Sequence, residues 1–420
     1  MEKEDKSKDY SWNFSVNLLD GVSFWFGFSL ISTTTILPLF ISKLTESLIP
    51  IGLISVIHSA GWFLPQLFSA RITERYEQKK KIVVGWGFFL ERVPIYLMVV
   101  STFFARTNPV IALGLMLFAL TWNALGAGVV APAWMSLIAK IFPPTKRGSF
   151  FGITMFIGSA FGILGSILSV WLLETYIFPD SFIILYSIAA VFTTFSWGFL
   201  ALTREPKEVV EDNGESWQTY WKDLFKIIKN DQNYRRFVIS SLIITLGGMG
   251  SGFVTISAIQ RFNVSDATVG LYSLTLLAGQ TVGYLILGKL ADRYGHKKSL
   301  EIGVGAILLA FVVAFFMRNP SLYFIVFILL GVNLSSWIVS GMLVVWEFCD
   351  TARVPTYSGL ANTVRGIIGS IAPLIGTQIA SVGFGHLFSI SALITLFGLL
   401  MLRVWVTEPR FDDRSHQKAA

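Results

Sequence analysis

Long apolar runs, separated by short polar connections, follow one another along nearly all of the 420 residues. An α-helix needs roughly 20 consecutive apolar residues to cross the hydrocarbon core of a bilayer, and twelve segments meet that requirement. The predicted spans are residues 17–41, 50–70, 82–104, 110–138, 149–173, 181–202, 236–259, 268–288, 299–317, 321–346, 356–382 and 386–406. The pattern therefore predicts an all-α membrane protein with twelve transmembrane helices.

The basic residues indicate how these spans cross the membrane. With a cytoplasmic N-terminus, four of the 33 Lys and Arg residues fall in outside loops, namely Lys43, Arg106, Arg261 and Arg318. Three more lie inside predicted spans, and the remaining 26 fall in cytoplasmic segments. Cytoplasmic loops of membrane proteins carry an excess of Lys and Arg. We therefore expect a multi-pass protein of the plasma membrane (the inner membrane in a bacterial cell) with both termini cytoplasmic.

Composition agrees with a lipid environment. Hydrophobic residues make up 53% of the chain and charged residues 14%, with a mean hydropathy of +0.63, whereas about 25% of the residues of a soluble domain are charged. The net charge of +7 is accounted for by the cytoplasmic loops, so no nucleic-acid partner is expected. The charged N-terminus lacks the apolar core of a signal peptide. The single cysteine, Cys349, offers neither a disulfide nor a thiol metal cluster, and we expect no metal and no cofactor.

The longest polar stretch, residues 203–235, leaves six predicted spans on each side. We therefore expect an N-terminal half at 1–202, a cytoplasmic linker at 203–235 and a C-terminal half at 236–420. Between residues 217 and 229 the apolar positions recur at helical spacing, which indicates an amphipathic helix on the membrane surface. An ordinary solvated linker is the alternative.

A shift of 218 residues aligns part of the first half with the second. The aligned groups are Gly61 with Gly279, Glu74-Arg75-Tyr76 with Asp292-Arg293-Tyr294, and Lys79-Lys80 with Lys297-Lys298. At the ends of the two halves, Glu205-Pro206 echoes Glu408-Pro409. A single offset that aligns all the groups of this stretch indicates an internal duplication, a feature of many transporter folds.

One loop of the second half has a recognisable sequence. It reads Gly288-Lys-Leu-Ala-Asp292-Arg293-Tyr294-Gly295-His-Lys297-Lys298. This loop resembles the signature loop of the major facilitator superfamily. The corresponding loop of the first half keeps Glu74 and Arg75 but carries Ala70 and Glu77 in place of the two motif glycines. The resemblance implies two six-helix halves and secondary transport by alternating access.

The resemblance also implies a conformational latch, in which the signature loop of one half meets the fifth helix of the other half. Its expected members are Gly288, Asp292, Arg293, Gly295, Lys297, Lys298, Glu74, Arg75, Arg147 and Arg353. Asp292 is expected to approach the start of the fifth span beside Arg147, because helix N-termini favour a carboxylate.

Two further contacts of the latch are expected at the cytoplasmic side. Glu74 should approach the start of the eleventh span, near Arg353. Within the second half, Arg293 should pair with Glu347 or Asp350. Together these contacts would close the cytoplasmic side of the protein.

Several ionisable residues fall within predicted spans, where a charge is costly and is usually functional. We take Asp20, His58, Glu91, Arg92 and Arg365 as candidates for contact with a substrate or a coupling ion. For Glu91 and Arg92 a structural role is equally open. Adjacent residues of a helix point about 100° apart, so these two should not simply neutralise each other and at least one should reach another helix. The alternatives are a packing role for His58 and a place near the lipid headgroups for Asp20.

The resemblance implies that the first and fourth helices of each half line the substrate cavity. The candidates in this chain are Trp25, Phe28, Trp122, Asn123, Phe253, Asn333 and Trp337. Aromatic rings offer contact area and amides fix orientation, which suits a small amphipathic organic solute. The same aromatic side chains could instead face lipid.

These observations favour a secondary transporter that works by alternating access, with import and efflux both open. Its expected partners are a small-molecule substrate, the lipid bilayer and a coupling ion, with proton and sodium both open. We expect a monomer that is not an enzyme. A membrane-embedded enzyme and a non-transporting sensor are the alternative functions.

Overall fold

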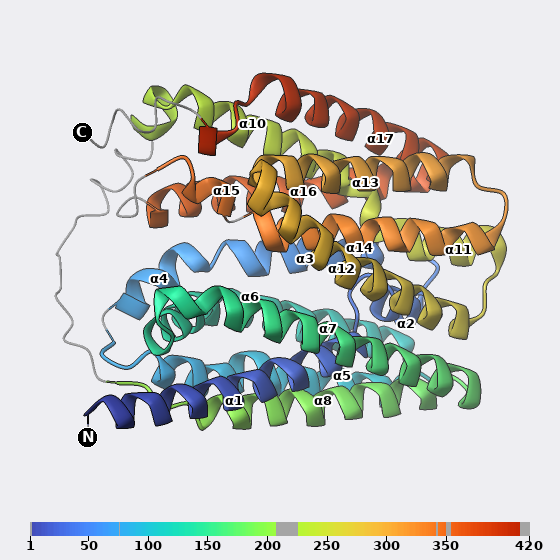
Figure 1. Cartoon of the computed structure of the whole chain (residues 1–420). Helices are drawn as coiled ribbons and strands as arrows, with labels where there is room; N and C mark the ends of the chain where they lie inside the picture. Colours follow the sequence, from blue (N-terminus) through green and yellow to red (C-terminus); the bar gives the residue numbers. More distant parts are fainter. Residues whose placement is uncertain (1, 75, 207–225, 342, 350–353, 412–420) are drawn as a thin grey trace. The chain divides into compact units, whose positions relative to one another are not determined.

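The computed structural model describes residues 2–74, 76–206, 226–341, 343–349 and 354–411. Every regular element in these ranges is helical (Figure 1). The chain divides into two compact units, the first formed by Met1–Asp212 with Ser265–Leu274 and the second by Asn213–Val264 with Thr275–Ala420. The expected half boundaries at residues 202 and 235 remain a prediction.

Unit 1 is built from helices that pack lengthwise. They are α1 Glu2–Ser29, α2 Ile36–Leu44, α3 Ile49–Phe63, α4 Gln66–Glu74, the π-helical turns η1 Lys81–Trp86 and η2 Phe88–Arg92, α5 Val93–Phe103, α6 Pro109–Ile141, α7 Pro144–Thr175 and α8 Asp180–Ala201. Helix α1 packs along α7 and α8 and lies beside α8 in Figure 1. Helix α6 packs against α3, α4 and α5.

Unit 2 repeats this kind of construction. Its elements are α10 Gln232–Gly247, η3 Gly248–Phe253, α11 Val254–Phe262, α12 Asp266–Tyr294, α13 His296–Phe316, η4 Pro320–Leu322, α14 Tyr323–Ser340, α15 Leu343–Trp346, α16 Val354–Val382, α17 Phe384–Leu400, η6 Met401–Trp405 and η7 Pro409–Phe411. Helix α13 packs against α14 and α17, and α10 packs against α16 and α17.

Nine of the twelve predicted spans are confirmed, among the described residues, as helices long and apolar enough to cross a membrane. The predicted first span is interrupted between α1 and α2, where the polar run Ser32-Thr33-Thr34-Thr35 lies. The predicted second span is divided into α3 and α4 around Pro65, which cannot donate a backbone hydrogen bond. The predicted eleventh span coincides with α16. A count of twelve crossings therefore remains a prediction.

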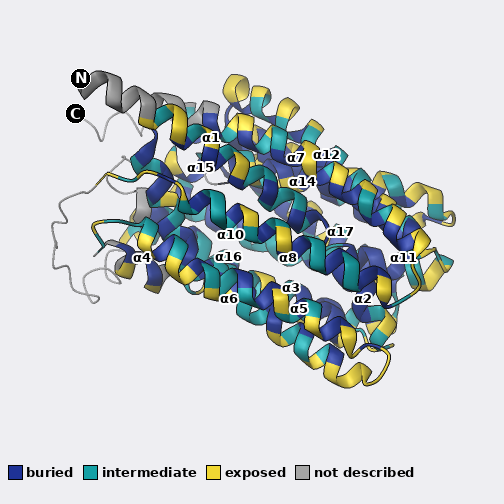
Figure 2. Ribbon diagram, turned by 90° about the horizontal axis from the view of Figure 1, so that it is seen from below, coloured by how far each residue is buried: buried dark blue, intermediate teal, exposed yellow. Residues whose placement is uncertain are grey.

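Large apolar residues remain exposed along the helices, and Figure 2 shows the exposed positions in yellow. Their exposed fractions reach 73% at Phe316 and 82% at Val404. Helices whose outer faces are apolar are expected in a membrane, because exposed apolar side chains are unfavourable in water but not in lipid hydrocarbon, which contains no water. The chain is a multi-pass membrane protein.

Glycines allow two pairs of helices to cross closely. A Cβ atom on Gly128 of α6 would lie 2.1 Å from the Gly61 carbonyl oxygen of α3. A Cβ atom on Gly331 of α14 would lie 2.1 Å from the Leu276 carbonyl oxygen of α12, and one on Gly279 would lie 2.3 Å from the Ile328 carbonyl oxygen. Small residues let membrane helices approach this closely. The aligned residues Gly61 and Gly279 thus occupy the same kind of crossing in the two units.

Most of the predicted amphipathic helix lies outside the described residues. Positions 217–225 of the expected amphipathic helix belong to this undescribed part, whereas residues 226–230 are helical. The surface helix therefore remains a prediction. The next helix, α10, begins where the carboxylate of Asp231 accepts a hydrogen bond from the Tyr234 N–H at 2.9 Å.

Candidate functional site

A cluster of charged side chains is buried in unit 1, where α1, η2 and α8 carry Asp20, Arg92 and Ser196. Asp20 and Arg92 are 8% and 4% exposed. The Ser196 hydroxyl donates to Asp20 Oδ1 at 2.6 Å and accepts from Arg92 Nη2 at 3.3 Å. Arg92 Nε donates to the Thr193 carbonyl oxygen at 3.1 Å. The hydroxyl of Ser196 thus links a carboxylate to a guanidinium between three helices.

Glu91 completes this cluster, because its carboxylate forms an ion pair with Arg92. The expectation that these neighbours would not neutralise each other was wrong, whereas the expectation that one would reach another helix was right for Arg92. The π-helical turn Phe88–Arg92 has more residues per turn than an α-helix, which brings adjacent side chains closer in direction. Glu91 therefore contacts the Arg92 guanidinium directly, whereas Asp20 is linked to it through the Ser196 hydroxyl.

Asp20 lies next to Ser196 of α8 and shares that hydroxyl with Arg92. Its position relative to the lipid headgroups remains a prediction. Ser196 was not among the expected residues. Its signal was available, because hydroxyl groups in apolar helices usually hydrogen bond to a polar group on a neighbouring helix.

The two asparagines expected in the cavity are bonded to backbone instead. Asn123 Nδ2 donates to the Glu91 carbonyl oxygen at 2.7 Å, and Asn333 Nδ2 donates to the Gly303 carbonyl oxygen at 2.9 Å. Asn123 and Asn333 are 8% and 7% exposed. In each unit one of the two N–H groups of an asparagine amide therefore ties two helices together.

Arg365 occupies a second charged position, in unit 2. Its guanidinium carbon lies 4.5 Å from the ring centroid of Trp337 in α14 and 5.7 Å from that of Phe237 in α10. Its Nε and Nη2 atoms are buried, and neither has a hydrogen-bond partner in the described part of the chain. Sequence reasoning placed Arg365 and Trp337 in the candidate site, and the structure brings them into contact.

A short chain of hydrogen bonds holds the helices around Arg365. The Tyr234 hydroxyl donates to the Tyr357 carbonyl oxygen at 2.6 Å, and the Tyr357 hydroxyl donates to the Asp231 carboxylate at 3.2 Å. The two tyrosine rings lie 4.5 Å apart between centroids. These contacts join the first turn of α10 to α16 and fix the distance between the helices that carry Phe237 and Arg365.

The signature loop of the second half is braced by Glu408. Gly295 has φ +93°, and a Cβ atom at this position would lie 2.4 Å from the Glu408 side chain. The positive φ and the short distance to Glu408 each require glycine at this position of the motif. The Lys297 N–H donates to the Glu408 carboxylate, and Lys297 Nζ donates to the Arg403 carbonyl oxygen at 3.3 Å. Burial raises the pKa of the Glu408 carboxyl to about 7, and the nearby Glu347 carboxylate acts in the same direction.

The first half uses Glu205 in the corresponding role. Its carboxylate, with a fully buried side chain, accepts hydrogen bonds from the Lys79 and Lys80 N–H groups at 2.9 and 2.8 Å. Lys140 Nζ lies 3.1 Å from the same carboxylate. Both Glu-Pro pairs of the repeat therefore anchor the loops that follow α4 and α12, although the first loop has Glu77 in place of the glycine.

Arg293 does not pair with Glu347 as expected. Arg410 takes that place, with Nη2 at 2.7 Å and Nε at 2.9 Å from the same Glu347 oxygen. The guanidinium of Arg293 instead lies 5.2 Å from the centroid of the Tyr294 ring. Asp350, the other expected partner, lies outside the described residues. Pro409 turns the chain after the last span, which brings Arg410 to Glu347, and sequence reasoning missed this residue.

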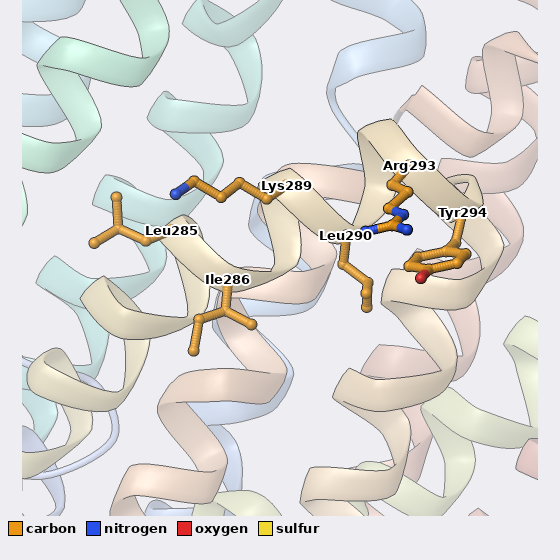
Figure 3. Close-up of a pocket in the computed structure, with 6 residues that line it drawn as sticks. All are labelled: Leu285, Ile286, Lys289, Leu290, Arg293 and Tyr294. Carbon is orange, nitrogen blue, oxygen red and sulfur yellow. The ribbon is translucent and has the colours of Figure 1, made fainter.

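The hollow next to this loop does not form an enclosed binding site. It has a volume of about 330 Å³ and is bordered by side chains of α12 alone, as Figure 3 shows. Its lining residues are Leu285, Ile286, Lys289, Leu290, Arg293 and Tyr294. Ligand sites usually bury most of their ligand among several elements, so this surface does not suggest a substrate site.

The remaining expected residues are scattered. Gly158 of α7 packs against the Trp25 indole, Phe28 stacks on Phe24 with 4.2 Å between centroids, and Trp122 packs on Phe118. Phe253 is fully buried, and His58 is exposed.

Part of the expected latch cannot be placed. Arg75 and Arg353 lie outside the described residues, as do the side chains of Glu74 and Arg147. The latch therefore remains a prediction.

Comparisons with known proteins agree with this architecture. The model of the Major Facilitator Superfamily matches residues 19–259 and 237–419. An uncharacterised MFS-type transporter of Escherichia coli, YdeE, is 26% identical over 40% of this chain and 42% of its own length. A gallate transporter of Pseudomonas putida is 29% identical over 27% of this chain and 26% of its own length. The chain thus aligns with less than half of either relative.

Solved structures share the fold at low sequence identity. A D-xylose–proton symporter has a TM-score of 0.67 at 13% identity, covering 94% of this chain and 98% of its own. The human organic anion transporter MFSD10 has a TM-score of 0.62 at 13% identity, covering 94% of this chain and 99% of its own.

Proposed function

This chain belongs to the Major Facilitator Superfamily, and from its membership we propose that it is a secondary transporter that moves a small amphipathic organic solute by alternating access. Its two six-helix halves rock about a central site, and both termini are cytoplasmic in a plasma-membrane monomer. The excess of Lys and Arg in the cytoplasmic loops supports this orientation. The relatives named for gallate, D-xylose and organic anions include both anionic and neutral solutes, and thus leave the solute class open.

The buried cluster of Asp20, Glu91 and Arg92 carries the proposal of ion coupling. The cluster contains two carboxylates and one guanidinium, with Glu91 bound to Arg92 directly and Asp20 linked to it through Ser196, so its net charge is −1 when both carboxylates are ionised. An uncompensated charge is costly away from water. A proton or a sodium ion would each leave the cluster neutral. We propose the proton, because a sodium ion needs several oxygen ligands, whereas Asp20 is bonded to a hydroxyl that already donates to it and lies next to a guanidinium.

The position of the cluster suits a coupling role. Ser196 and Thr193 of α8, Asp20 of α1 and Arg92 of η2 meet there, so a change in the protonation of Asp20 alters contacts among three helices. A shift in the packing of one six-helix half is what alternating access requires.

The test combines a binding screen with a transport measurement. A thermal-shift screen of the purified protein identifies a solute, and its uptake is then measured in proteoliposomes with an imposed pH gradient. We expect accumulation that a protonophore abolishes. We expect Asp20→Asn to exchange solute without accumulating it. Absence of flux would overturn transport, and accumulation driven by sodium alone would overturn proton coupling.

A further inference from the structure

The guanidinium of Arg365 differs from the other stacked guanidinium groups in what its N–H groups contact. Arg261 also stacks on a ring, that of Phe262, at 5.3 Å, but its Nη1 and Nη2 atoms donate to the carbonyl oxygens of Ala314 and Met317 at 2.8 and 2.9 Å. Arg365 has buried Nε and Nη2 atoms without a partner among the described residues. A buried donor that is left unpaired is destabilising, and more so on a charged group.

The two unpaired atoms lie on the same edge of the guanidinium plane. The Nε–H and one Nη2–H point in parallel along this edge, at the spacing of the two oxygens of a carboxylate. Bidentate pairs of this kind are among the strongest hydrogen-bonded contacts in proteins. The edge therefore matches a carboxylate better than it matches a single carbonyl oxygen.

Trp337 and Phe237 hold this charge without using its donors. Cation–π contacts act on the face of the guanidinium, whereas its N–H groups lie in the plane. The distances of 4.5 and 5.7 Å from the guanidinium carbon to the ring centroids place aromatic surface next to the charge. The stacking thus keeps the cation in an apolar setting, and two atoms of its edge have no hydrogen-bond partner among the described residues.

The surroundings favour an organic monoanion. The group that contacts Arg365 is aromatic, and the nearby Tyr234 hydroxyl is already bonded to the Tyr357 carbonyl oxygen. One guanidinium balances one negative charge. Inorganic phosphate or sulfate would bring four hydrated oxygens to an apolar surrounding where the guanidinium edge supplies two donors, and desolvation of the remaining oxygens would not be repaid.

We propose that Arg365, flanked by Trp337 and Phe237, binds the carboxylate of the transported solute, which is therefore an organic monocarboxylate with an apolar or aromatic body. This inference rests on the proposed transport function. The bonds among Tyr234, Tyr357 and Asp231 position the site by joining α10 to α16.

A binding experiment on the full-length purified protein tests the proposal. The protein is kept in detergent with phosphatidylcholine as the only lipid. Benzoate, phenylacetate and octanoate are titrated beside their amides and beside inorganic phosphate, and binding is followed by tryptophan fluorescence and thermal shift. We expect at least one carboxylate to bind at least tenfold more tightly than its amide, and no binding of phosphate. Failure of every carboxylate to exceed its amide would overturn the proposal.

Variants separate a ligand contact from a structural role. Arg365→Lys keeps the positive charge but lacks the planar edge with two parallel N–H groups, so it should weaken carboxylate binding about tenfold. Arg365→Gln removes the charge as well and should abolish carboxylate binding. Because the open edge is costly without a ligand, the ligand-free melting temperature of Arg365→Gln should equal or exceed that of the wild type. Two results together would show a structural role for Arg365. They are a melting temperature of Arg365→Gln below that of the wild type, and an Arg365→Lys variant that still prefers carboxylates over amides as the wild type does.

Arg236→Gln is the matched control. Arg236 lies one residue before Phe237 in α10 and stacks on Trp405 at 5.7 Å, so this variant also removes one charge and one cation–π contact. It should bind carboxylate as the wild type does. Equal loss of binding in both variants would mean that overall charge attracts the anion. Binding seen only in Asp350→Asn would show that an internal carboxylate is the occupant, which would also overturn the proposal.

The proposal and the transport function can fail separately. Flux of a neutral solute without carboxylate binding would overturn the anion site and leave transport in place. Carboxylate binding to Arg365 without any flux in proteoliposomes would overturn the transport function and leave the anion site in place. The site would then not serve a transported solute.

Discussion

At the residue scale, buried guanidinium groups are satisfied in different ways in the two units. Arg92 has an ion pair and hydrogen bonds to two groups of α8, whereas Arg365 has two aromatic faces and an unpaired edge. A fully bonded charge holds its neighbours in place, and removing it leaves them unpaired. An open edge costs stability until a ligand fills it. The two arginines should therefore respond oppositely to mutation.

Arg92→Gln should destabilise the protein strongly. The variant would leave the carboxylates of Glu91 and Asp20 buried without a cation, and breaking such a buried pair costs about 3–5 kcal/mol. The melting temperature of the purified protein measures this loss. Asp20→Asn, which removes the excess negative charge, should cost much less. A larger loss in Asp20→Asn than in Arg92→Gln would contradict the assigned charge balance.

Glu408 should make stability depend on pH. Burial raises the pKa of its carboxyl to about 7 from the ordinary 4.5, so the folded protein holds this proton more tightly than the unfolded chain does. Its contribution is therefore fully present below pH 4.5 and is lost as the pH rises through 7. Glu408→Gln, which cannot ionise, should melt at a higher temperature than the wild type at pH 8.

The comparison across pH provides the control for this prediction. The melting temperatures of Glu408→Gln and the wild type should converge near pH 4, where the carboxyl is mostly protonated in both the folded protein and the unfolded chain. Glu205→Gln should lower the melting temperature at pH 8, because Lys140 and two N–H groups bind that carboxylate. A difference between Glu408→Gln and the wild type that does not change with pH would exclude Glu408 as the titrating group.

At the element scale, close crossings through glycine determine which helices pack together. Gly331→Val should disrupt the crossing of α14 with α12, because even a Cβ atom would lie 2.1 Å from the Leu276 carbonyl oxygen. We expect a loss of folded protein, measured by size-exclusion chromatography after detergent extraction. Gly288→Ala is the matched control, since nothing lies within 4 Å of its Cβ position. Equal yields of the two variants would show that the crossing tolerates side chains.

The positions of most elements could be predicted from the sequence, because lipid requires long apolar runs. Nine predicted spans coincide with helices of that kind. The interruption at Ser32–Thr35 was missed, although a polar run within an apolar segment signals it. The pairing of Arg410 with Glu347 depends on how Pro409 turns the chain, which periodicity does not determine. Candidate residues were therefore easier to predict than their partners.

At the scale of the whole molecule, the proposed orientation in the membrane rests on the distribution of basic residues. Cys349, the only cysteine, lies in the connection that the topology places in the cytoplasm. An impermeant maleimide should label it in inside-out vesicles and leave it unlabelled in intact cells. Labelling in intact cells, with a cytoplasmic marker protein unlabelled, would reverse the proposed orientation.

The two halves of the internal repeat differ in their functional features. Both Glu-Pro pairs brace a loop, but the glycine with positive φ occurs in the second loop, at Gly295. Sequence comparison of the halves predicted this difference from Glu77. It could not predict that Ser196 would link Asp20 to Arg92, or that Arg365 would lie against Trp337 and Phe237, because these contacts depend on packing between helices that are distant in sequence.

The central claim, movement of one half relative to the other, is tested most directly by a distance measurement. Spin labels are placed at Ile153→Cys of α7 and Lys289→Cys of α12, both exposed positions near the expected latch, in a Cys349→Ser background. Alternating access predicts two populations of the label distance by double electron–electron resonance, with Asp292→Asn shifting the balance about tenfold or more toward the longer distance, since about 1.4 kcal/mol is tenfold. A single distance distribution that Asp292→Asn leaves unchanged would contradict the account.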